Sequence, residues 1–322
     1  MRQPDALLKA LRTGSRFLIT THDFPDGDGL GSQMALVLAL RAFGKTVYAI
    51  NPSETPEKFS LVDPQGLIQV YKSGALPPVD AAVILDTNEL KMAGPMTAPL
   101  KALGVPLVFI DHHSPEAMPS GPHFVDETRA ATGELVYQVI QELGVKLDAA
   151  MALALYVAIV TDTAGFRYHR TSPFSHRIAA ELLELGVEPE AVYFSLFARE
   201  SVPKTRLLGW TLERLQTAAG GKVAWLTIPS EDRKRFGATV EDTESFVGFL
   251  TLLKGVQIGV LFREEDDGRV KISFRGMGDA PVIDLARSLG GGGHQFAAGA
   301  RVSEPMQAVV TRVLAACQAQ LA

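Results

Sequence analysis

Three short apolar runs, each closed by a histidine or an aspartate, constrain the fold of this chain more than any other feature. They are RFLITT (16–21) before His22, AAVIL (81–85) before Asp86, and LVFI (107–110) before Asp111. Continuous runs of this kind, with helical stretches between them, indicate parallel strands that are buried on both faces. Ligands bind such sheets beyond the carboxyl ends of the strands. We therefore expect an α/β fold, a parallel sheet with helices on both faces, and a polar site at that edge.

The pattern changes near residue 208, and a length of 322 residues exceeds what one core needs. Before that point, we expect a further strand at 46–50 and helices at 30–43, 133–143, 149–160, 175–185 and 189–200. After it, we expect strands at 222–228, 256–263 and 270–275. The chain is accordingly divided into an N-terminal domain at 1–188, a helical linker at 189–207 and a smaller C-terminal α/β domain at 208–322.

The composition points to a cytoplasmic enzyme with a small substrate. An apolar fraction of 47% and a charged fraction of 21% are typical of a soluble globular protein. The single cysteine, Cys317, excludes an internal disulfide and suits a reducing cytosol. The longest apolar stretch, 151–160, is too short for a bilayer, and the first residues lack the order of a secretory signal. We therefore expect no membrane partner, and the net charge of −5 argues against long nucleic acid as a partner.

His22, Asp26 and Asp28 lie in one loop after the first of these strands. Imidazole and carboxylate groups are suitable ligands for Mn²⁺ and related divalent metals. The alternative is a capping loop, in which Asp26 or Asp28 is the N-cap of the next helix. A dinucleotide-binding loop is excluded, because the glycines of this segment lack the G-x-G-x-x-G spacing.

The other strand ends add more residues of the same chemistry. Asp86 ends one strand, Asp111-His112-His113 ends another, and Asp162 follows an apolar helix. Each aspartate taken singly is a common turn former, but together with the first loop they favour a dinuclear metal centre. Neighbouring residues on an extended segment point in opposite directions, so one histidine could bind a metal while the other meets a substrate or leaving group.

A glycine cluster at 290–293, followed by His294, is the main feature of the C-terminal domain. Consecutive glycines allow backbone N–H groups to converge on an anion, whereas the alternative is a flexible connector. Arg275 ends a predicted strand and could contact a phosphate through two nitrogens, or it could be an ordinary surface arginine. Three further residues near the site segments are interpreted as solvated or structural, namely Arg129, Arg167 and His176.

These segments together resemble the motifs of the DHH phosphoesterases. The matching segments are His22-x-x-Pro-Asp26-Gly-Asp28, Asp86-Thr87, Asp111-His112-His113, Thr161-Asp162-Thr163, and GGGGHQFAAG (290–299). They occur in the family's order and cover nearly the whole chain. The length and the two-domain layout are most similar to the branch of bacterial enzymes that degrade very short RNAs to mononucleotides and remove the 3′-phosphate of phosphoadenosine phosphate.

The resemblance implies a role for each matching residue. A first metal would be held by His22, Asp26 and Asp86, and a second by Asp28, Asp86, His112 and Asp162. Asp111 would orient a neighbouring group, and His113 would contact the scissile phosphate and protonate the leaving oxygen. The terminal phosphate of the substrate would be held by Arg275, Gly291, Gly292, Gly293 and His294. The cofactor would be two Mn²⁺ ions, with Mg²⁺ or Co²⁺ as substitutes, and the active site would lie in the cleft between the domains.

Three positions depart from the usual family pattern. Phe24 stands where asparagine is common, Ala164 where glycine is common, and Gly276 where serine is common. None of them is an implied metal ligand. Because Phe24 could present a stacking ring beside the metals, these departures leave the substrate preference open.

We therefore expect a Mn²⁺-dependent phosphoesterase that acts on short RNA oligonucleotides and phosphoadenosine phosphate. The nearest alternative enzyme is a phosphodiesterase for cyclic or linear dinucleotides. A RecJ-type exonuclease would need a longer chain and a basic groove, and an inorganic pyrophosphatase would lack the glycine segment. The alternative from another class is a nucleotide-binding regulator without activity, and the oligomeric state is left open, with a homodimer as one option.

Overall fold

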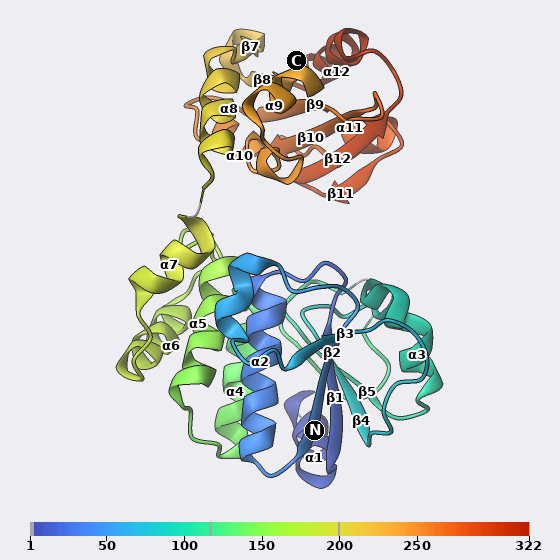
Figure 1. The fold of residues 1–322 in the computed structure, drawn as a ribbon, viewed down its shortest axis with the longest axis vertical. Coiled ribbons are helices and arrows are strands. Elements are labelled where there is room, and N and C mark those ends of the chain that lie inside the picture. Colours follow the sequence, from blue (N-terminus) through green and yellow to red (C-terminus); the bar gives the residue numbers. More distant parts are fainter. Residues whose placement is uncertain (1–2, 116–117, 199, 322) are drawn as a thin grey trace. The chain divides into compact units, whose positions relative to one another are not determined.

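The computed structural model describes residues 3–115, 118–198 and 200–321, and the chain divides into two units, Met1–Arg199 and Glu200–Ala322 (Figure 1). The range expected as a helical linker, 189–207, covers helix α7 (Pro189–Phe197) and the first half of a separate helix, α8 (Val202–Glu213). Val192 of α7 is buried in the core of the first unit, and Leu207 of α8 is buried in the second. Each helix thus belongs to the core of one unit.

A six-stranded parallel sheet forms the centre of the first unit, with the order β3-β2-β1-β4-β5-β6 (Figure 1). The strands are β1 (Arg16–Thr21), β2 (Thr46–Asn51), β3 (Ile68–Val70), β4 (Ala81–Leu85), β5 (Leu107–Asp111) and β6 (His123–Val125). All neighbouring pairs run parallel. The strand order reverses between β1 and β4, and ligands bind beyond the carboxyl ends of the strands at such a point. The expected parallel α/β sheet is confirmed.

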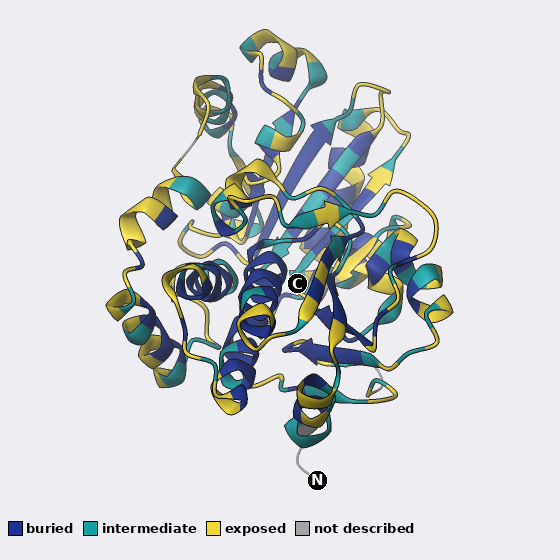
Figure 2. Cartoon of the chain, turned by 60° about the horizontal axis from the view of Figure 1, so that its bottom comes forward, coloured by how far each residue is buried: buried dark blue, intermediate teal, exposed yellow. Residues whose placement is uncertain are grey.

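Helices cover both faces of this sheet. One face is covered by α1 (Gln3–Thr13), α2 (Gly27–Ala42) and α4 (Thr132–Leu143), and η2 (Leu90–Met96) and α3 (Thr97–Ala102) lie on the other. Behind the first layer, α5 (Ala149–Asp162) packs against α2 and α4, and α6 (Pro173–Glu184) packs against α5. Successive residues of β1 alternate between the two cores, since Phe17 and Ile19 lie in the first and Leu18 in the second. Figure 2 shows buried residues concentrated along the strands. The three central strands, β1, β4 and β5, are therefore almost wholly buried and mostly apolar, whereas β2 alternates between buried and exposed residues.

Helix α2 begins three residues before the expected start, because Asp26 caps it. Oδ1 of Asp26 accepts hydrogen bonds from the N–H groups of Asp28 and Gly29, at 3.0 and 3.1 Å. The alternative that Asp26 is the N-cap of this helix is therefore confirmed, whereas Asp28 lies inside its first turn. Further along, Gly31 lies so close to α5 that a β-carbon there would be 2.3 Å from the carbonyl oxygen of Ala154.

The second unit contains a mixed sheet with the order β11-β12-β10-β9-β8-β7. Its strands are β7 (Gln216–Ala218), β8 (Val223–Ile228), β9 (Ile258–Glu264), β10 (Val270–Gly276), β11 (Gly292–His294) and β12 (Ala297–Val302). Besides α8, its helices are α9 (Ser230–Phe236), α10 (Val247–Leu250), α11 (Ile283–Ser288) and α12 (Met306–Leu321). Only β8 and β9 pair in parallel, and the remaining neighbours are antiparallel. The expected smaller α/β domain is confirmed, and among the described residues no helix is both long and apolar enough to cross a bilayer.

Candidate metal centre

All six residues expected to bind metal lie together at the carboxyl ends of the parallel strands. Three groups have one ligand atom from each member within 4.8 Å of the others: His22 with Asp26 and Asp86, Asp28 with His112 and Asp162, and Asp86 with His112 and His113. Asp86 and His112 each belong to two groups, so the groups form one connected cluster. The cluster lies at the switch point of the sheet, because β1 leads into His22 and β4 into Asp86.

Two of the three histidines of the cluster, His22 and His112, are oriented in the same way by backbone carbonyl groups. Nδ1 of His22 lies 2.9 Å from the carbonyl oxygen of Asp23, and Nδ1 of His112 lies 3.2 Å from that of Arg129. A carbonyl oxygen only accepts, so Nδ1 carries the proton and Nε2 keeps its lone pair in the neutral ring. Both Nε2 atoms face carboxylates, at 3.6 Å from Asp86 for His22 and 3.0 Å from Asp162 for His112. Metal-binding histidines typically have this arrangement.

Asp28 is a fully buried carboxylate that closes the N-terminus of helix α4 from another part of the chain. Its Oδ2 accepts from the N–H of Thr132 at 2.6 Å, and its Oδ1 from the N–H of Gly133 at 2.9 Å. The hydroxyl of Ser32, one turn along α2, also donates to Oδ1 at 3.1 Å. The positive end of the α4 dipole and these donors stabilise the buried charge, and they fix the side chain where it meets His112.

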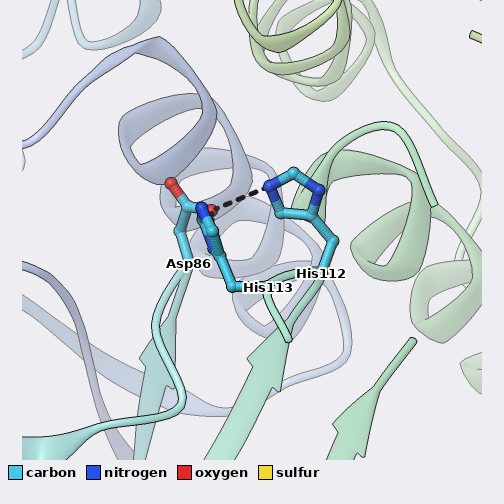
Figure 3. A group of neighbouring side chains, drawn as sticks. All are labelled: Asp86, His112 and His113. Atoms are coloured by element: carbon cyan, nitrogen blue, oxygen red, sulfur yellow. Dashed lines mark ion pairs between the residues drawn. The ribbon is translucent and has the colours of Figure 1, made fainter. Parts of the chain in front are cut away.

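Asp86 lies at the centre of the cluster in an unusual backbone conformation. Its φ angle is 58°, in the left-handed region that aspartate tolerates better than most residues. The hydroxyl of Thr132 donates to Oδ1 at 3.0 Å, while Oδ2 faces His22. Figure 3 shows the ring of His112 approaching the same carboxylate, with Nε2 3.8 Å from Oδ1. A carboxylate placed between two imidazoles in this way can bridge two ions.

The charges of the cluster perturb one another strongly. Burial, followed by the charges of Asp86 and Asp162, raises the pKa of Asp28 well above its usual value, and burial likewise raises the pKa of Asp86. Burial alone would lower the pKa of His22, but its interactions with Asp26 and Asp86 outweigh burial and raise that pKa to about 10. Crowded buried carboxylates of this kind are stabilised by a bound cation.

The donor set fits divalent cations well. Nε2 of His112 is buried without a hydrogen-bond partner among the described residues, although Asp162 is adjacent. The cluster offers carboxylate oxygens and imidazole nitrogens, a combination suited to Mn²⁺ and similar ions, whereas the single cysteine, Cys317, is buried in the second unit. One imidazole nitrogen that meets three carboxylates and has no hydrogen-bond partner among the described residues is an arrangement that a divalent cation would complete.

His113 makes different contacts from His112, but the two rings do not point in opposite directions as expected. Their centroids are 4.4 Å apart, edge to face, because β5 ends at Asp111 and the chain bends at His113. Nδ1 of His113 lies 2.8 Å from Oδ1 of Asp111, and this hydrogen bond, only partly opposed by burial, raises the pKa of His113 to about 9. Half of the His113 side chain remains exposed. Its Nε2 is therefore left for a ligand.

The residues expected to bind phosphate in the second unit lie at one end of its sheet. Ala297 of β12 pairs with Arg275 of β10 on one side and with His294 of β11 on the other, so these three residues form one row. Directly paired residues share a face of the sheet. The Arg275 guanidinium donates to the carbonyl oxygen of Phe274 at 2.9 Å, while the His294 side chain lies outside the described part of the chain.

The glycine segment is an edge strand rather than a flexible connector. A β-carbon at Gly291 would lie 2.1 Å from the carbonyl oxygen of Gly299, and one at Gly293 would lie 2.6 Å from that of Ala297. Gly292 has open space around it. Two of these glycines, Gly291 and Gly293, are thus required by the close approach of β12, whether or not this segment binds a ligand.

Arg129 is one of the residues interpreted as solvated or structural. It pairs with Asp126 and lies over the ring of Phe174.

Sequence reasoning missed the groups that hold the cluster in place. Asn88 donates to Oδ2 of Asp111 at 2.6 Å and to the carbonyl oxygen of His113 at 3.0 Å. Its position two residues after Asp86 was a usable signal. The sequence gave no such signal for Thr132 and Gly133, because their hydrogen bonds to Asp28 join residues more than 100 positions apart.

Two family models and a relative match most of this chain. The model of the DHH family, N-terminal domain, matches residues 16–159, and that of the DHHA1 domain matches residues 220–322. The bifunctional oligoribonuclease and PAP phosphatase NrnA of Thermus thermophilus is 33% identical over 326 aligned residues, which cover 100% of this chain and 94% of that protein.

Two solved structures extend the similarity to the fold. An exopolyphosphatase-related protein from Bacteroides fragilis has a TM-score of 0.90 at 26% identity, covering 99% of this chain and 96% of that one. The exonuclease RecJ bound to manganese has a TM-score of 0.55 at 17% identity, covering 97% of this chain and 92% of that one, and this shows a shared fold.

Proposed function

The chain belongs to the DHH family of metal-dependent phosphoesterases, and from this premise we propose that it hydrolyses very short oligoribonucleotides to mononucleotides and removes the 3′-phosphate of 3′-phosphoadenosine 5′-phosphate. We further propose two Mn²⁺ ions as the cofactor and the cytoplasm as the place of action. The observation that carries this proposal is the position of the Asp86 carboxylate, which has His22 on Oδ2 and His112 on Oδ1. The similarity to the oligoribonuclease and PAP phosphatase of Thermus thermophilus, which covers 94% of that protein, supports the choice of substrate class.

Each ion would have its own set of protein ligands. The first set is His22, Asp26 and Asp86, and the second is Asp28, Asp86, His112 and Asp162. When bound, the pair of ions would neutralise the phosphate and generate the nucleophile from water. Oxygen and nitrogen ligands of this kind also accept Mg²⁺ and Co²⁺, which we propose as substitutes.

The proton for the leaving oxygen would come from His113. Its Nδ1 is committed to Asp111 and lies 3.8 Å from the Asp86 carboxylate, so Nε2 of the half-exposed ring is the nitrogen left for the leaving oxygen. Asp111 keeps the ring oriented and, by raising the pKa of His113 to about 9, keeps it protonated at neutral pH. Asn88 holds Asp111 from the other side. These three residues would therefore act as one proton-donating unit.

The second unit would bind the substrate's terminal phosphate. Arg275 and the backbone of residues 291–294 lie at the same end of the sheet, in neighbouring rows. Arg275 has no carboxylate partner among the described residues, so its guanidinium is available for an anion. A site that holds one terminal phosphate favours substrates only a few nucleotides long.

A product assay with Mn²⁺ tests this function. A 5′-labelled RNA trimer, 3′-phosphoadenosine 5′-phosphate and cyclic di-AMP are each offered to the wild type and to Asp86→Ala. We expect mononucleotides from the trimer and free phosphate from the second substrate, with both activities lost in the variant. Turnover of the cyclic dinucleotide alone would favour a dinucleotide phosphodiesterase, and metal binding without any turnover would favour a nucleotide-binding regulator.

A further inference from the structure

Phe24 is the most exposed of the large apolar side chains in the described part of the chain. Its relative exposure is 83%, although it lies two residues after His22 in the loop that begins the metal cluster. Its φ angle is 54°, in the left-handed region. A bulky residue with this conformation is a true outlier, and such backbone strain is concentrated at functional sites. Phe24 therefore combines an exposed side chain with a strained backbone, next to the candidate metal centre.

The backbone of this loop is fixed by contacts with other elements. The N–H of Phe24 donates to Oγ of Ser53 at 2.8 Å, and the N–H of Asp23 donates to the carbonyl oxygen of Met92 at 2.7 Å. The Asp23 carboxylate lies against Gly94, where a β-carbon would be 2.8 Å from Oδ2. The ring of Phe24 is therefore presented to solvent from a rigid loop, without being part of a core.

The distance from the metal cluster suits a nucleotide. Two residues of chain span at most about 7 Å between α-carbons, so the backbone of Phe24 lies within about the length of one nucleotide from that of His22. The base of a nucleotide is separated from its phosphate by one ribose. A phosphate at the cluster thus brings its own base to the neighbourhood of the exposed ring.

We propose that Phe24 stacks on a nucleobase of the substrate and makes the enzyme selective for nucleotides over other phosphate esters. This inference rests on the proposed function, since it assumes that a nucleotide phosphate binds at the cluster. Stacking suits a short substrate, because every base has a π-face and an aromatic side chain accepts bases without regard to sequence. It also explains why the loop exposes an apolar ring that the core does not need.

Two dinucleotide substrates separate base recognition from the chemistry. One is the RNA dimer pApA, and the other is its analogue in which both bases are replaced by hydrogen. The variants are Phe24→Asn, which removes the ring but tolerates a left-handed backbone, and Phe24→Trp, which keeps an aromatic face. We expect Phe24→Asn to raise KM for pApA roughly 10- to 100-fold, the range for loss of one stacked base, and to change KM for the baseless analogue far less. Phe24→Trp should restore the preference for pApA.

A control variant and a binding measurement complete the test. Phe43→Asn makes the same substitution at an exposed ring beyond the opposite end of α2, about 24 Å away along the helix, and should leave both KM values unchanged. In protein loaded with Mg²⁺, AMP, a mononucleotide product that is not cleaved further, should quench the fluorescence of Phe24→Trp more than that of the wild type, whose tryptophans are Trp210 and Trp225. Ribose 5-phosphate should not produce this quenching.

The possible results distinguish this inference from the function on which it rests. Equal losses of activity on pApA and on the baseless analogue, or no extra quenching by AMP, would overturn stacking while the phosphoesterase function stands. A wild type that hydrolyses neither dinucleotide would remove the proposed function. Quenching of Phe24→Trp by AMP would then still support a base-binding ring at this loop.

Discussion

Nδ1 of His113 donates a hydrogen bond of 2.8 Å to the buried carboxylate of Asp111, and this contact is the largest cause of the raised pKa of His113. A proton donor works only below its own pKa, so activity is retained at neutral pH and lost as pH rises through that pKa. Asp111→Asn removes the negative charge and should lower the pKa of His113 from about 9 toward its ordinary value of 6.5. The alkaline limb of the kcat profile should therefore move to lower pH, with a loss of about tenfold or more at pH 8.

Asn88→Ala provides the comparison for this pH profile. Asn88 donates to Oδ2 of Asp111 at 2.6 Å, so its removal loosens the carboxylate but keeps its charge. We expect kcat to fall with only a small shift of the alkaline limb. If Asp111→Asn leaves the limb where it is in the wild type, His113 is not the proton donor.

A second prediction concerns the hydroxyl of Thr132, which donates to Oδ1 of Asp86 at 3.0 Å. Thr132→Val keeps the shape of the side chain and the backbone N–H that binds Asp28, and removes only this donor. Loss of a group that orients a metal ligand typically weakens metal affinity by about 10- to 100-fold. We expect that loss for Mn²⁺ in calorimetric titrations, with little change in melting temperature.

Thr20→Val is the matched control for this variant. Thr20 is also fully buried, on β1, but its hydroxyl contacts only the carbonyl oxygen of Thr21 and the sulfur of Met96. Its Mn²⁺ affinity should equal that of the wild type. Equal affinity in both variants would show that the Thr132 hydroxyl does not position Asp86.

The strands and the metal-binding candidates could be predicted from the sequence for the same physical reason. A strand buried on both faces is a continuous apolar run, so a polar residue at its end, such as His22 or Asp86, marks both the strand boundary and the site. The family resemblance drawn from these motifs is confirmed by the full-length similarity to relatives. The start of α2 was placed too late, because Asp26 had to be recognised as a cap as well as a candidate ligand.

Contacts between distant segments could not be predicted in this way. The hydrogen bonds from Thr132 and Gly133 to Asp28 depend on how α4 is placed against α2, which no local pattern encodes. The glycines at 291 and 293 looked like an anion-binding loop or a linker, and only the pairing of β11 with β12 shows their packing role. Backbone strain at Phe24 was equally invisible in the sequence.

A third prediction is that Mn²⁺ binding releases protons at pH 8. Without metal, the pKa of His22 is raised to about 10, so its ring is protonated at pH 8, whereas a metal needs the neutral imidazole. Binding should therefore release about one proton or more, and the affinity should fall as pH is lowered because the proton competes better. Titration calorimetry in HEPES and in Tris, which differ in ionisation enthalpy, measures the number of protons released.

His123→Asn is the control for proton release. His123 lies on β6 and belongs to none of the three groups of candidate ligands. The variant should release as many protons as the wild type. An observed enthalpy of binding that is the same in both buffers would contradict the prediction that His22 is protonated in the metal-free protein and loses its proton when it binds the metal.

The last prediction concerns the close approach of α2 and α5, which places Asp28 beside Asp162. Gly31 is the contact point, since a β-carbon there would lie 2.3 Å from the carbonyl oxygen of Ala154 and 2.9 Å from the nitrogen of Ala158. Backbone atoms cannot swing aside, so Gly31→Ala must push the helices apart. We expect a loss of about 1–3 kcal/mol in the free energy of unfolding, together with weaker Mn²⁺ binding.

Gly209→Ala is the matched substitution, because Gly209 lies inside helix α8 with open space around it. It should stabilise the second unit by up to about 1 kcal/mol, through the ordinary gain of alanine over glycine in a helix. Far-ultraviolet circular dichroism follows urea unfolding of both units, and the fluorescence of Trp210 and Trp225 follows only the second. Gly31→Ala should lower the dichroism midpoint and leave the fluorescence midpoint unchanged. A Gly31→Ala protein with wild-type stability and metal affinity would show that the helices tolerate separation, and that Asp28 and Asp162 do not depend on this contact.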